Sequence, residues 1–221
     1  MELESSGQLV ALNIATGKWA VVLDKLSLAN GIDVDAKRDR LIFAETFRAQ
    51  IISIDLDNIR AAFKSAKSGD RLSNVQKAAL IRLLPGLPDN IVVEKDIAYI
   101  ALPFVKPKGM ELIDHLATAP QVRKFIGRFL YGNGKLLEYV CQNLYHHPLL
   151  ETTYREILAG HLMYTIMQTD QSAVLEYDLS SGSSRLLGSN TFGFLSEASP
   201  DAKGNLYLGS FRSPFLVKVK V

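Results

Sequence analysis

The feature that most constrains this chain is a succession of short alternating or apolar segments, each bounded by turn residues. The segments GQLVALNIA and WAVVLD flank Thr16-Gly17-Lys18, which is a hairpin signal. ANGIDVDA, DRLIFAET and AQIISIDLD follow, and the same texture returns near the C-terminus in AVLEYDL, NLYLGSF and FLVKVKV. So many short strands predict an all-β fold, either a sandwich, a barrel or a propeller.

A weak internal repeat favours the propeller among these three architectures. A strand start that carries Asp or Asn, followed by two hairpins, begins near Leu28, Leu87 and Leu195. A four-stranded unit every ~40–50 residues is typical of propeller blades. The spacings between these units are longer, and they fit the propeller pattern only if two segments are insertions. One is Arg60–Val75, which is expected to be a loop or short helix, and the other is a helical segment. About three units cannot close a ring of roughly four to eight blades, so we expect a partial, open propeller.

A helical insertion is expected at residues 109–167 of the propeller part that residues 1–221 form. Apolar residues recur at helical spacing within Val122–Leu130, with Arg123, Lys124 and Arg128 on the other side. Glycines at 132 and 134 predict a break before a second helix at residues 136–144. The apolar face with its basic flank suits a membrane surface, and packing against the propeller explains it equally well.

Composition limits the classes of protein and of binding partner that fit this chain. The chain of 221 residues is 48% hydrophobic with a net charge of +2, so it can bury a core and offers no electrostatic case for a nucleic-acid partner. Its one cysteine, Cys141, excludes an internal disulfide and is expected to be a buried, inert thiol. The N-terminus is too polar and acidic for a signal peptide, and no apolar run reaches the ~20 residues that span a bilayer. We therefore expect neither an export signal nor an anchor in this sequence.

Three motifs in order resemble the strictosidine synthase-like family. They are Leu28-Ala29-Asn30-Gly31-Ile32 with Ala44-Glu45-Thr46 downstream, Leu84-Pro85-Gly86-Leu87-Pro88-Asp89-Asn90-Ile91, and the run from Ser196-Glu197 to Leu216. The last run is most similar to the membrane-associated members. The resemblance implies a six-bladed propeller, of which this chain covers the C-terminal half. It also implies association with a membrane through an anchor that lies outside this chain, so the compartment of this product stays open.

The resemblance implies a calcium site in the central channel, because paraoxonase-type relatives hold calcium on an Asn and an Asp-Asn pair. The matching residues here are Asn30, Asp89 and Asn90, each near the start of an expected inner strand. Their amide and carboxylate oxygens are what Ca²⁺ requires. Capping of turns is the alternative role for these residues. Further ligands are expected from blades outside this chain, so its own ligand set is incomplete.

Glu197 is the candidate catalytic carboxylate by the same resemblance, which places an essential glutamate at the start of the last blade. Counting back from Leu206-Tyr207-Leu208-Gly209 selects Glu197, whereas alignment with the membrane-associated members selects Ser196. Burial would raise the pKa of a catalytic glutamate toward its working pH. A solvated residue at the strand end is the alternative for Glu197.

The four histidines offer weaker candidates. His146 and His147 precede Pro148 in a helix-ending turn, where a structural role is favoured over zinc binding. His161 carries no specific expectation, and His115 lies in the helical insertion as a weak candidate general base.

Two functions from different classes follow. The first is a calcium-assisted ester hydrolase of the arylesterase or lactonase type, with a small-molecule ester or lactone as substrate. The second is a non-catalytic, membrane-associated scaffold or binding protein. An inert fragment, with half its site outside the chain, is the third reading.

Overall fold

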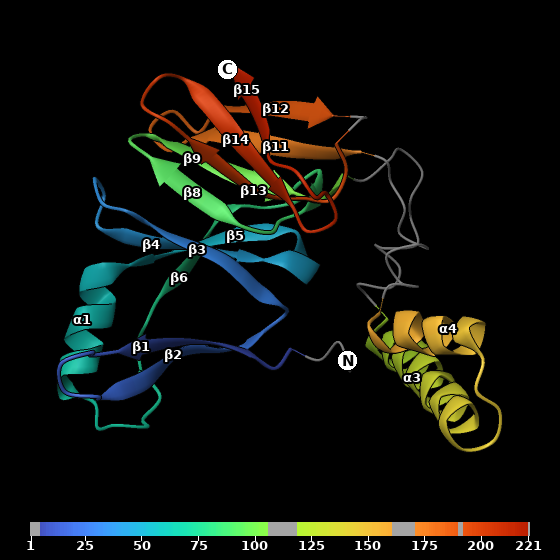
Figure 1. The fold of residues 1–221 in the computed structure, drawn as a ribbon. Helices are drawn as coiled ribbons and strands as arrows, with labels where there is room; N and C mark the ends of the chain where they lie inside the picture. Colours follow the sequence, from blue (N-terminus) through green and yellow to red (C-terminus); the bar gives the residue numbers. More distant parts are fainter. Residues whose placement is uncertain (1–4, 106–118, 161–170, 190–191, 221) are drawn as a thin grey trace. The chain divides into compact units, whose positions relative to one another are not determined.

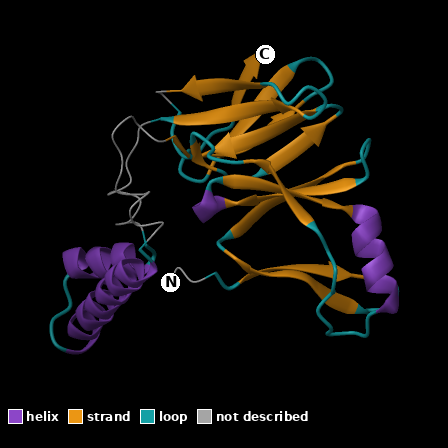
Figure 2. Cartoon of the chain, turned by 180° about the vertical axis from the view of Figure 1, so that it is seen from behind, coloured by secondary structure: helices purple, strands orange, loops and turns teal. Residues whose placement is uncertain are grey.

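The computed structural model describes residues 5–105, 119–160, 171–189 and 192–220. The chain divides into two compact units, one formed by residues 5–107 with 169–221 and the other containing residues 108–168. The described strands all belong to the first unit, and the helices α3 and α4 belong to the second (Figures 1 and 2). Most of the first unit is strand in small antiparallel sheets, which confirms the all-β prediction.

The first two sheets follow each other along the chain. β1 (Gly7–Leu12) and β2 (Trp19–Leu26) form a two-stranded sheet, in which Asn13 Oδ1 accepts hydrogen bonds from the backbone of the predicted turn. β3 (Ala29–Asp35), β4 (Arg40–Glu45), β5 (Gln50–Asp55) and β6 (Lys77–Ile81) form a four-stranded meander. A single turn of 3₁₀-helix, Thr46–Arg48, joins β4 to β5.

The polar insertion after β5 contains α1 (Leu56–Ser65), so the short-helix alternative is confirmed, with the helix beginning at Leu56 instead of Arg60. Asp55 sets this start, because its carboxylate accepts hydrogen bonds from the backbone of Asp57 and Asn58. β5 therefore ends at Asp55, earlier than the apolar pattern predicts.

Two further sheets complete the first unit. β8 (Ile91–Glu94), β9 (Ile97–Leu102), β11 (Ser172–Asp178) and β12 (Ser184–Ser189) form a second four-stranded sheet. The short strands β7 (Gly86–Leu87) and β10 (Phe104–Val105) pair with each other beside it. β13 (Leu195–Pro200), β14 (Asn205–Ser210) and β15 (Val217–Lys220) form a three-stranded sheet.

An apolar core lies between each pair of consecutive sheets. Ile42, Ile51, Ile91 and Ile100 are buried between the β3–β6 sheet and the β8–β12 sheet. A second core joins the β8–β12 sheet to the β13–β15 sheet, and a third joins β1–β2 and α1 to the β3–β6 sheet. The sheets thus succeed one another in chain order, as Figure 1 shows, and this order brings β3, β8 and β13 next to one another.

Charged residues join the β3–β6 sheet to the β8–β12 sheet. They lie near the C-terminal ends of β3 and β8. Asp35 is fully buried at the end of β3 and pairs with Arg38 (3.1 Å) and Arg40 (2.9 Å). Arg38 reaches across to Asp96, which lies in the β8–β9 turn, at 2.7 Å. Because Arg38 and Lys37 donate to it, the pKa of Asp96 lies well below its usual range.

The second unit is a helical hairpin of α3 (Pro120–Asn143) and α4 (Pro148–Leu158). The predicted break at the glycine pair is wrong, because α3 runs through Gly132 and Gly134 without interruption. Neither glycine has a positive φ. A Cβ on Gly134 would lie 2.7 Å from Leu158 Cδ2, so this glycine serves the close approach of α4 instead of ending a helix.

Candidate metal and catalytic site

The starts of three consecutive sheets meet at one place in the first unit. Gly31 N in β3 donates to Asp89 O, just ahead of β8, at 3.1 Å. Asn90 N donates to Ser196 O in β13 at 3.3 Å. The backbone therefore brings Asn30, Asp89–Asn90 and Ser196–Glu197 together from positions that lie up to 167 residues apart in sequence. We call this convergence of β3, β8 and β13 the strand-start site.

The backbone ahead of these strands repeats an unusual conformation. Leu28 precedes β3 with φ of 58°, and Phe194 precedes β13 with the same φ of 58°. Leu83, three residues ahead of β7, has φ of 55°. A leucine or phenylalanine rarely adopts the left-handed region, where the side chain crowds the backbone. The same conformation also occurs at Lys25, Asp39, Ala49, Asn74 and Lys95, so it marks tight changes of chain direction and does not by itself mark a functional site.

Irregular pairing follows in two of the three strands. The register of β3 against β4 shifts between Ala29 and Ile32, and that of β13 against β14 shifts between Leu195 and Glu197. A bulge leaves a residue outside the ladder and re-aims its side chain. The shifts coincide with Asn30 in β3 and with Ser196 in β13, so both candidates stand at irregular points of their strands.

Thr46 positions Asn30. The Thr46 hydroxyl is buried, donates to Pro88 O at 2.7 Å and accepts from Asn30 Nδ2 at 3.3 Å. The Asn30 amide also donates to the Asp89 carboxylate, which opposes the rise in the pKa of Asp89. Because both bonds use the amide nitrogen, Asn30 Oδ1 is the atom that can ligate a cation.

Two carboxyl groups of the strand-start site, Asp89 and Glu197, have pKa values above those of ordinary carboxyl groups. Burial raises the pKa of Asp89 above its ordinary value. Burial also raises the pKa of Glu197, and the nearby negative charges of Asp89 and Asp33 raise it further. Negative charge is therefore gathered in a half-buried place, where a bound cation would be favourable.

Asp33 and Thr46 belong to this site and sequence reasoning did not select them. Asp33 Oδ2 accepts a hydrogen bond from Val93 N in β8 at 2.7 Å, so it ties β3 to β8 one pleat beyond Gly31. The alternation of β3 is the signal that could have found it, because Gly31, Asp33 and Asp35 share one strand face. Thr46 stands in the Ala44-Glu45-Thr46 motif that carries the resemblance, but its contact with Asn30 depends on a loop that folds back beside β3 and has no signal in the local pattern.

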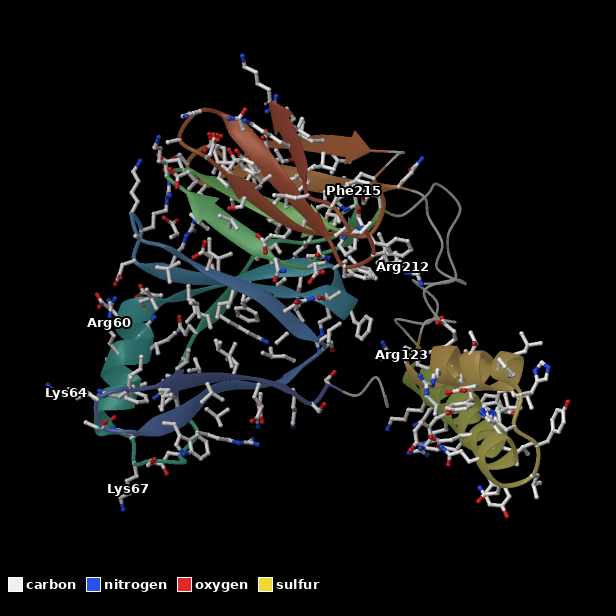
Figure 3. The ribbon with its side chains drawn as sticks, viewed as in Figure 1. Arg60, Lys64, Lys67, Arg123, Arg212 and Phe215 are labelled. Atoms are coloured by element: carbon white, nitrogen blue, oxygen red, sulfur yellow. The ribbon has the colours of Figure 1, made fainter. Side chains whose placement is uncertain are left out.

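An aromatic and basic wall stands next to the start of β13. Phe194 makes edge contacts with Phe104 (ring centroids 5.5 Å apart) and Phe211 (5.4 Å). The Arg212 guanidinium lies 4.7 Å from the centre of the Phe194 ring. Arg212 and Phe215, both in the β14–β15 loop, are labelled in Figure 3. This wall offers apolar contact and one positive charge beside Ser196–Glu197.

A surface hollow of about 620 Å³ lies elsewhere. Its lining includes Glu94 at the end of β8, Asp96 in the β8–β9 turn and Asp201 in the β13–β14 turn. These turns are at the opposite ends of β8 and β13 from Asn90 and Glu197, so the hollow is separate from the strand-start site.

One carboxylate cluster competes with the strand-start site as a cation site. Within the described residues, three carboxylate oxygens come within 4.8 Å of one another at Asp39, Asp55 and Asp57. Arg60 on α1, labelled in Figure 3, bonds Asp39 at 2.9 Å and Asp57 at 2.9 Å. Asp55 caps α1. Arg60 already pairs with two of the three carboxylates and the third caps α1, so the geometry of the cluster is explained by the helix it anchors.

The described histidines have structural roles. His147 caps α4, with Nδ1 accepting from Leu149 N at 3.2 Å. His146 Nδ1 lies 4.0 Å from the sulfur of Cys141, which is buried in α3 as predicted. His115, the candidate general base, and His161 lie outside the described residues.

The donor set of the strand-start site fits the calcium that the family resemblance implies. Asn30 and Asn90 offer amide oxygens, and Asp89 and Glu197 offer carboxylate oxygens, all of which are hard ligands. Sulfur and imidazole ligands, which would suit zinc or copper, are absent from the described residues that form this site.

Comparison with known proteins gives a consistent set of relatives. The chain is 26% identical over 224 aligned residues to the zebrafish protein named adipocyte plasma membrane-associated protein, and 25% identical to the human protein of that name. These alignments cover 99% and 100% of this chain and 44% of each relative. The Drosophila relative, hemomucin, is 31% identical over 131 residues, which are 57% of this chain and 20% of that protein. No family model matches the chain.

The chain thus spans less than half the length of the curated relatives that it matches. Their names place those proteins at the plasma membrane. No described helix of this chain is long and apolar enough to cross a membrane. The match extends over the three motifs on which the strictosidine synthase-like resemblance rests, and it confirms the expected relationship to the membrane-associated members. The chain is a homologue of the adipocyte plasma membrane-associated proteins over nearly its whole length.

Proposed function

We propose that this chain forms the later part of a six-bladed propeller that is a calcium-assisted hydrolase of the arylesterase or lactonase type. The observation that carries the proposal is the strand-start site, where Asn30, Asp89, Asn90 and Glu197 converge on one place. Ligands from the remainder of the propeller would complete the coordination. Two consecutive four-stranded antiparallel sheets, followed by a three-stranded one, support this architecture.

Asn30, Asp89 and Asn90 would hold the metal through their oxygens. Bound calcium supplies Lewis acidity toward the carbonyl oxygen of an ester or lactone. Glu197, whose pKa is raised, would accept a proton from the attacking water through its carboxylate. The water oxygen would form the new bond to the acyl carbon, the bond between that carbon and the ester oxygen would break, and the ester oxygen would take the proton that Glu197 had accepted. The aromatic wall around Phe194 suits an apolar acyl or aryl group.

The alternative function is a membrane-associated scaffold or binding protein that carries out no reaction. It is favoured by the relatives' names, which state membrane association and no reaction. In this case the strand-start site would bind calcium for stability alone, as metal binding to the folded state allows.

The test is hydrolysis of phenyl acetate and of a small lactone, with calcium and with a chelator, by a protein in which the remaining blades of the proposed propeller accompany this chain. We expect activity that the chelator abolishes and calcium restores. Glu197→Gln should lower kcat by about 10²–10⁴-fold, the usual contribution of a general base, whereas Ser196→Ala should retain activity. Chelator-resistant turnover, or full activity in Glu197→Gln, would overturn the proposed roles. Calcium binding without turnover of either substrate favours the scaffold.

A further inference from the structure

Arg212, labelled in Figure 3, carries a positive charge that no carboxylate of the described residues balances. Most of the described arginines do pair with a carboxylate, as Arg60 does with Asp39 and Arg185 with Glu176. The exposed Arg212 side chain instead lies over the ring of Phe194, 4.7 Å from its centre. This contact uses the face of the ring and leaves the N–H donors of the guanidinium free for another acceptor.

The β14–β15 loop holds Arg212 beside the start of β13. The Ser210 hydroxyl donates to Gly193 O at 3.0 Å. The same oxygen accepts from the backbone N–H of Arg212 at 3.1 Å and from that of Ser213 at 3.2 Å. One side chain therefore ties the loop after β14 to the residue that precedes Phe194, and this fixes the backbone on both sides of the contact between guanidinium and ring.

Arg212 and Glu197 belong to the same end of the β13–β15 sheet. Glu197 pairs with Gly209 across β13 and β14, and its Cβ lies 3.4 Å from the position that a Cβ on Gly209 would take. Arg212 follows Gly209 by three residues, and three residues of chain span at most ~10 Å. A small ester whose acyl carbon lies beside Glu197 can therefore reach the guanidinium with its other end.

The charges around the strand-start site give the guanidinium a specific use. The negative charges of Asp33 and Asp89 act on Glu197, so an anionic ligand is repelled there unless a positive charge receives it. One guanidinium balances one negative charge, and its planar pair of N–H donors matches the two oxygens of a carboxylate. The rings of Phe194 and Phe211 beside it offer apolar contact to an aryl group.

We propose that Arg212 is a specificity-determining residue that binds the carboxylate of an anionic substrate, so that the preferred ester carries both an aryl group and a carboxylate. The aryl group lies against Phe194 and Phe211, and the acyl carbon lies next to Glu197. The inference rests on the proposed hydrolase for its reaction, but binding of a carboxylate at Arg212 is measurable without turnover. In the alternative, Arg212 only holds the Phe194 ring, and its charge selects no ligand.

Binding is tested first, with benzoate and the neutral benzyl alcohol titrated in ligand-observed NMR and with the remaining blades of the proposed propeller present. We expect the wild type to prefer benzoate, because hydrogen bonds between charged groups are stronger than those of neutral groups. Arg212→Gln should weaken benzoate binding about tenfold and benzyl alcohol binding less than about twofold. Arg212→Lys keeps the charge and should retain most of the preference.

The matched control is Lys203→Gln, which removes the same charge from an exposed side chain in the β13–β14 turn, at the other end of the sheet. It should change benzoate binding less than about twofold. Equal weakening of both ligands in Arg212→Gln would show that Arg212 only holds the ring. No preference for benzoate in the wild type, or unchanged benzoate binding in Arg212→Gln, would overturn the proposal. Benzoate binding that a chelator abolishes equally in the wild type and Arg212→Gln would place the carboxylate on a metal instead.

Turnover then compares meta-acetoxybenzoate with its methyl ester, which share the acetyl ester and differ in charge. We expect Arg212→Gln to lower kcat/KM about tenfold for meta-acetoxybenzoate, mainly through KM, and less than about twofold for the methyl ester. Equal losses for the two substrates would contradict the assignment. If neither substrate is hydrolysed while benzoate binding still depends on Arg212, the proposed hydrolase is wrong and the carboxylate site stands.

Discussion

Substitution of Gly31 by alanine should be among the most damaging single changes in the chain. Gly31 is buried in β3, and its N–H donates to Asp89 O at 3.1 Å. A Cβ at this position would lie 2.4 Å from Asn90 Cα, 2.4 Å from Asp89 O and 2.6 Å from Ile91 N. All three are backbone atoms, so no side-chain rotation can relieve the clash.

The cost follows from the distances. Ordinary contact begins at 3.4 Å, so β3 and β8 must part by about 1 Å, which forfeits much of the attraction between them. Overpacking of this kind costs about 1–3 kcal/mol, and loss of the hydrogen bond to Asp89 O adds about 1 kcal/mol. A free energy of unfolding lowered by about 2–4 kcal/mol should reduce the melting temperature by roughly 4–16 °C in a chain of this size.

Gly188→Ala in β12 is the matched control, because a Cβ there meets nothing within 4 Å and the φ of Gly188 is not positive. We expect a change of less than about 0.5 kcal/mol for this control. Thermal unfolding followed by circular dichroism compares the two variants with the wild type. Equal melting temperatures for Gly31→Ala and Gly188→Ala would refute the close approach of β3 and β8. They would also refute the strand-start site, which depends on that approach.

Three further variants test other parts of the structure. The raised pKa of Glu197 means that its contribution to stability is complete below its ordinary pKa and is lost as pH rises through the folded-state value. Glu197→Gln should therefore melt above the wild type at neutral pH in calcium-free buffer, with the difference vanishing near about pH 4 in a melting-temperature series. Asp35→Asn should lower the free energy of unfolding by about 1–3 kcal/mol in a urea titration, because Arg40 loses its buried charged partner while Arg38 keeps Asp96. Gly132→Ala should stabilise α3 by about 0.5–1 kcal/mol in the same titration, since its Cβ would meet open space inside a continuous helix; destabilisation would mean that the helix is broken there.

The strands of this chain were predictable because local pattern determines them. Alternation and turn residues identified the hairpins around Gly17 and Gly182, where a positive φ suits glycine. The glycines of α3 were misleading, because glycine often ends a helix and α3 continues through both of them. Gly134 is selected by contact with Leu158, which is 24 residues away, and a local reading cannot detect a contact at that distance.

The candidate site was predictable only in part. The family motifs selected Asn30, Asp89 and Glu197, and the structure brings them together. Thr46 and Asp33 were not selected, because their roles depend on partners in neighbouring segments, Pro88 O and Val93 N. Such pairings arise from how the sheets stack, and stacking is set by apolar cores that join residues far apart in sequence.

The most direct test of a calcium site at the strand starts is a calcium titration by calorimetry of the wild type and two variants, each with the remaining blades of the proposed propeller present. Asp89→Asn removes one proposed ligand charge, and Asp57→Asn removes an exposed carboxylate of the competing cluster near α1. We predict saturable calcium binding by the wild type, marked weakening in Asp89→Asn, and unchanged binding in Asp57→Asn. Equal affinity in the wild type and Asp89→Asn would contradict the assignment. Loss of binding in Asp57→Asn alone would move the calcium to the cluster of Asp39, Asp55 and Asp57.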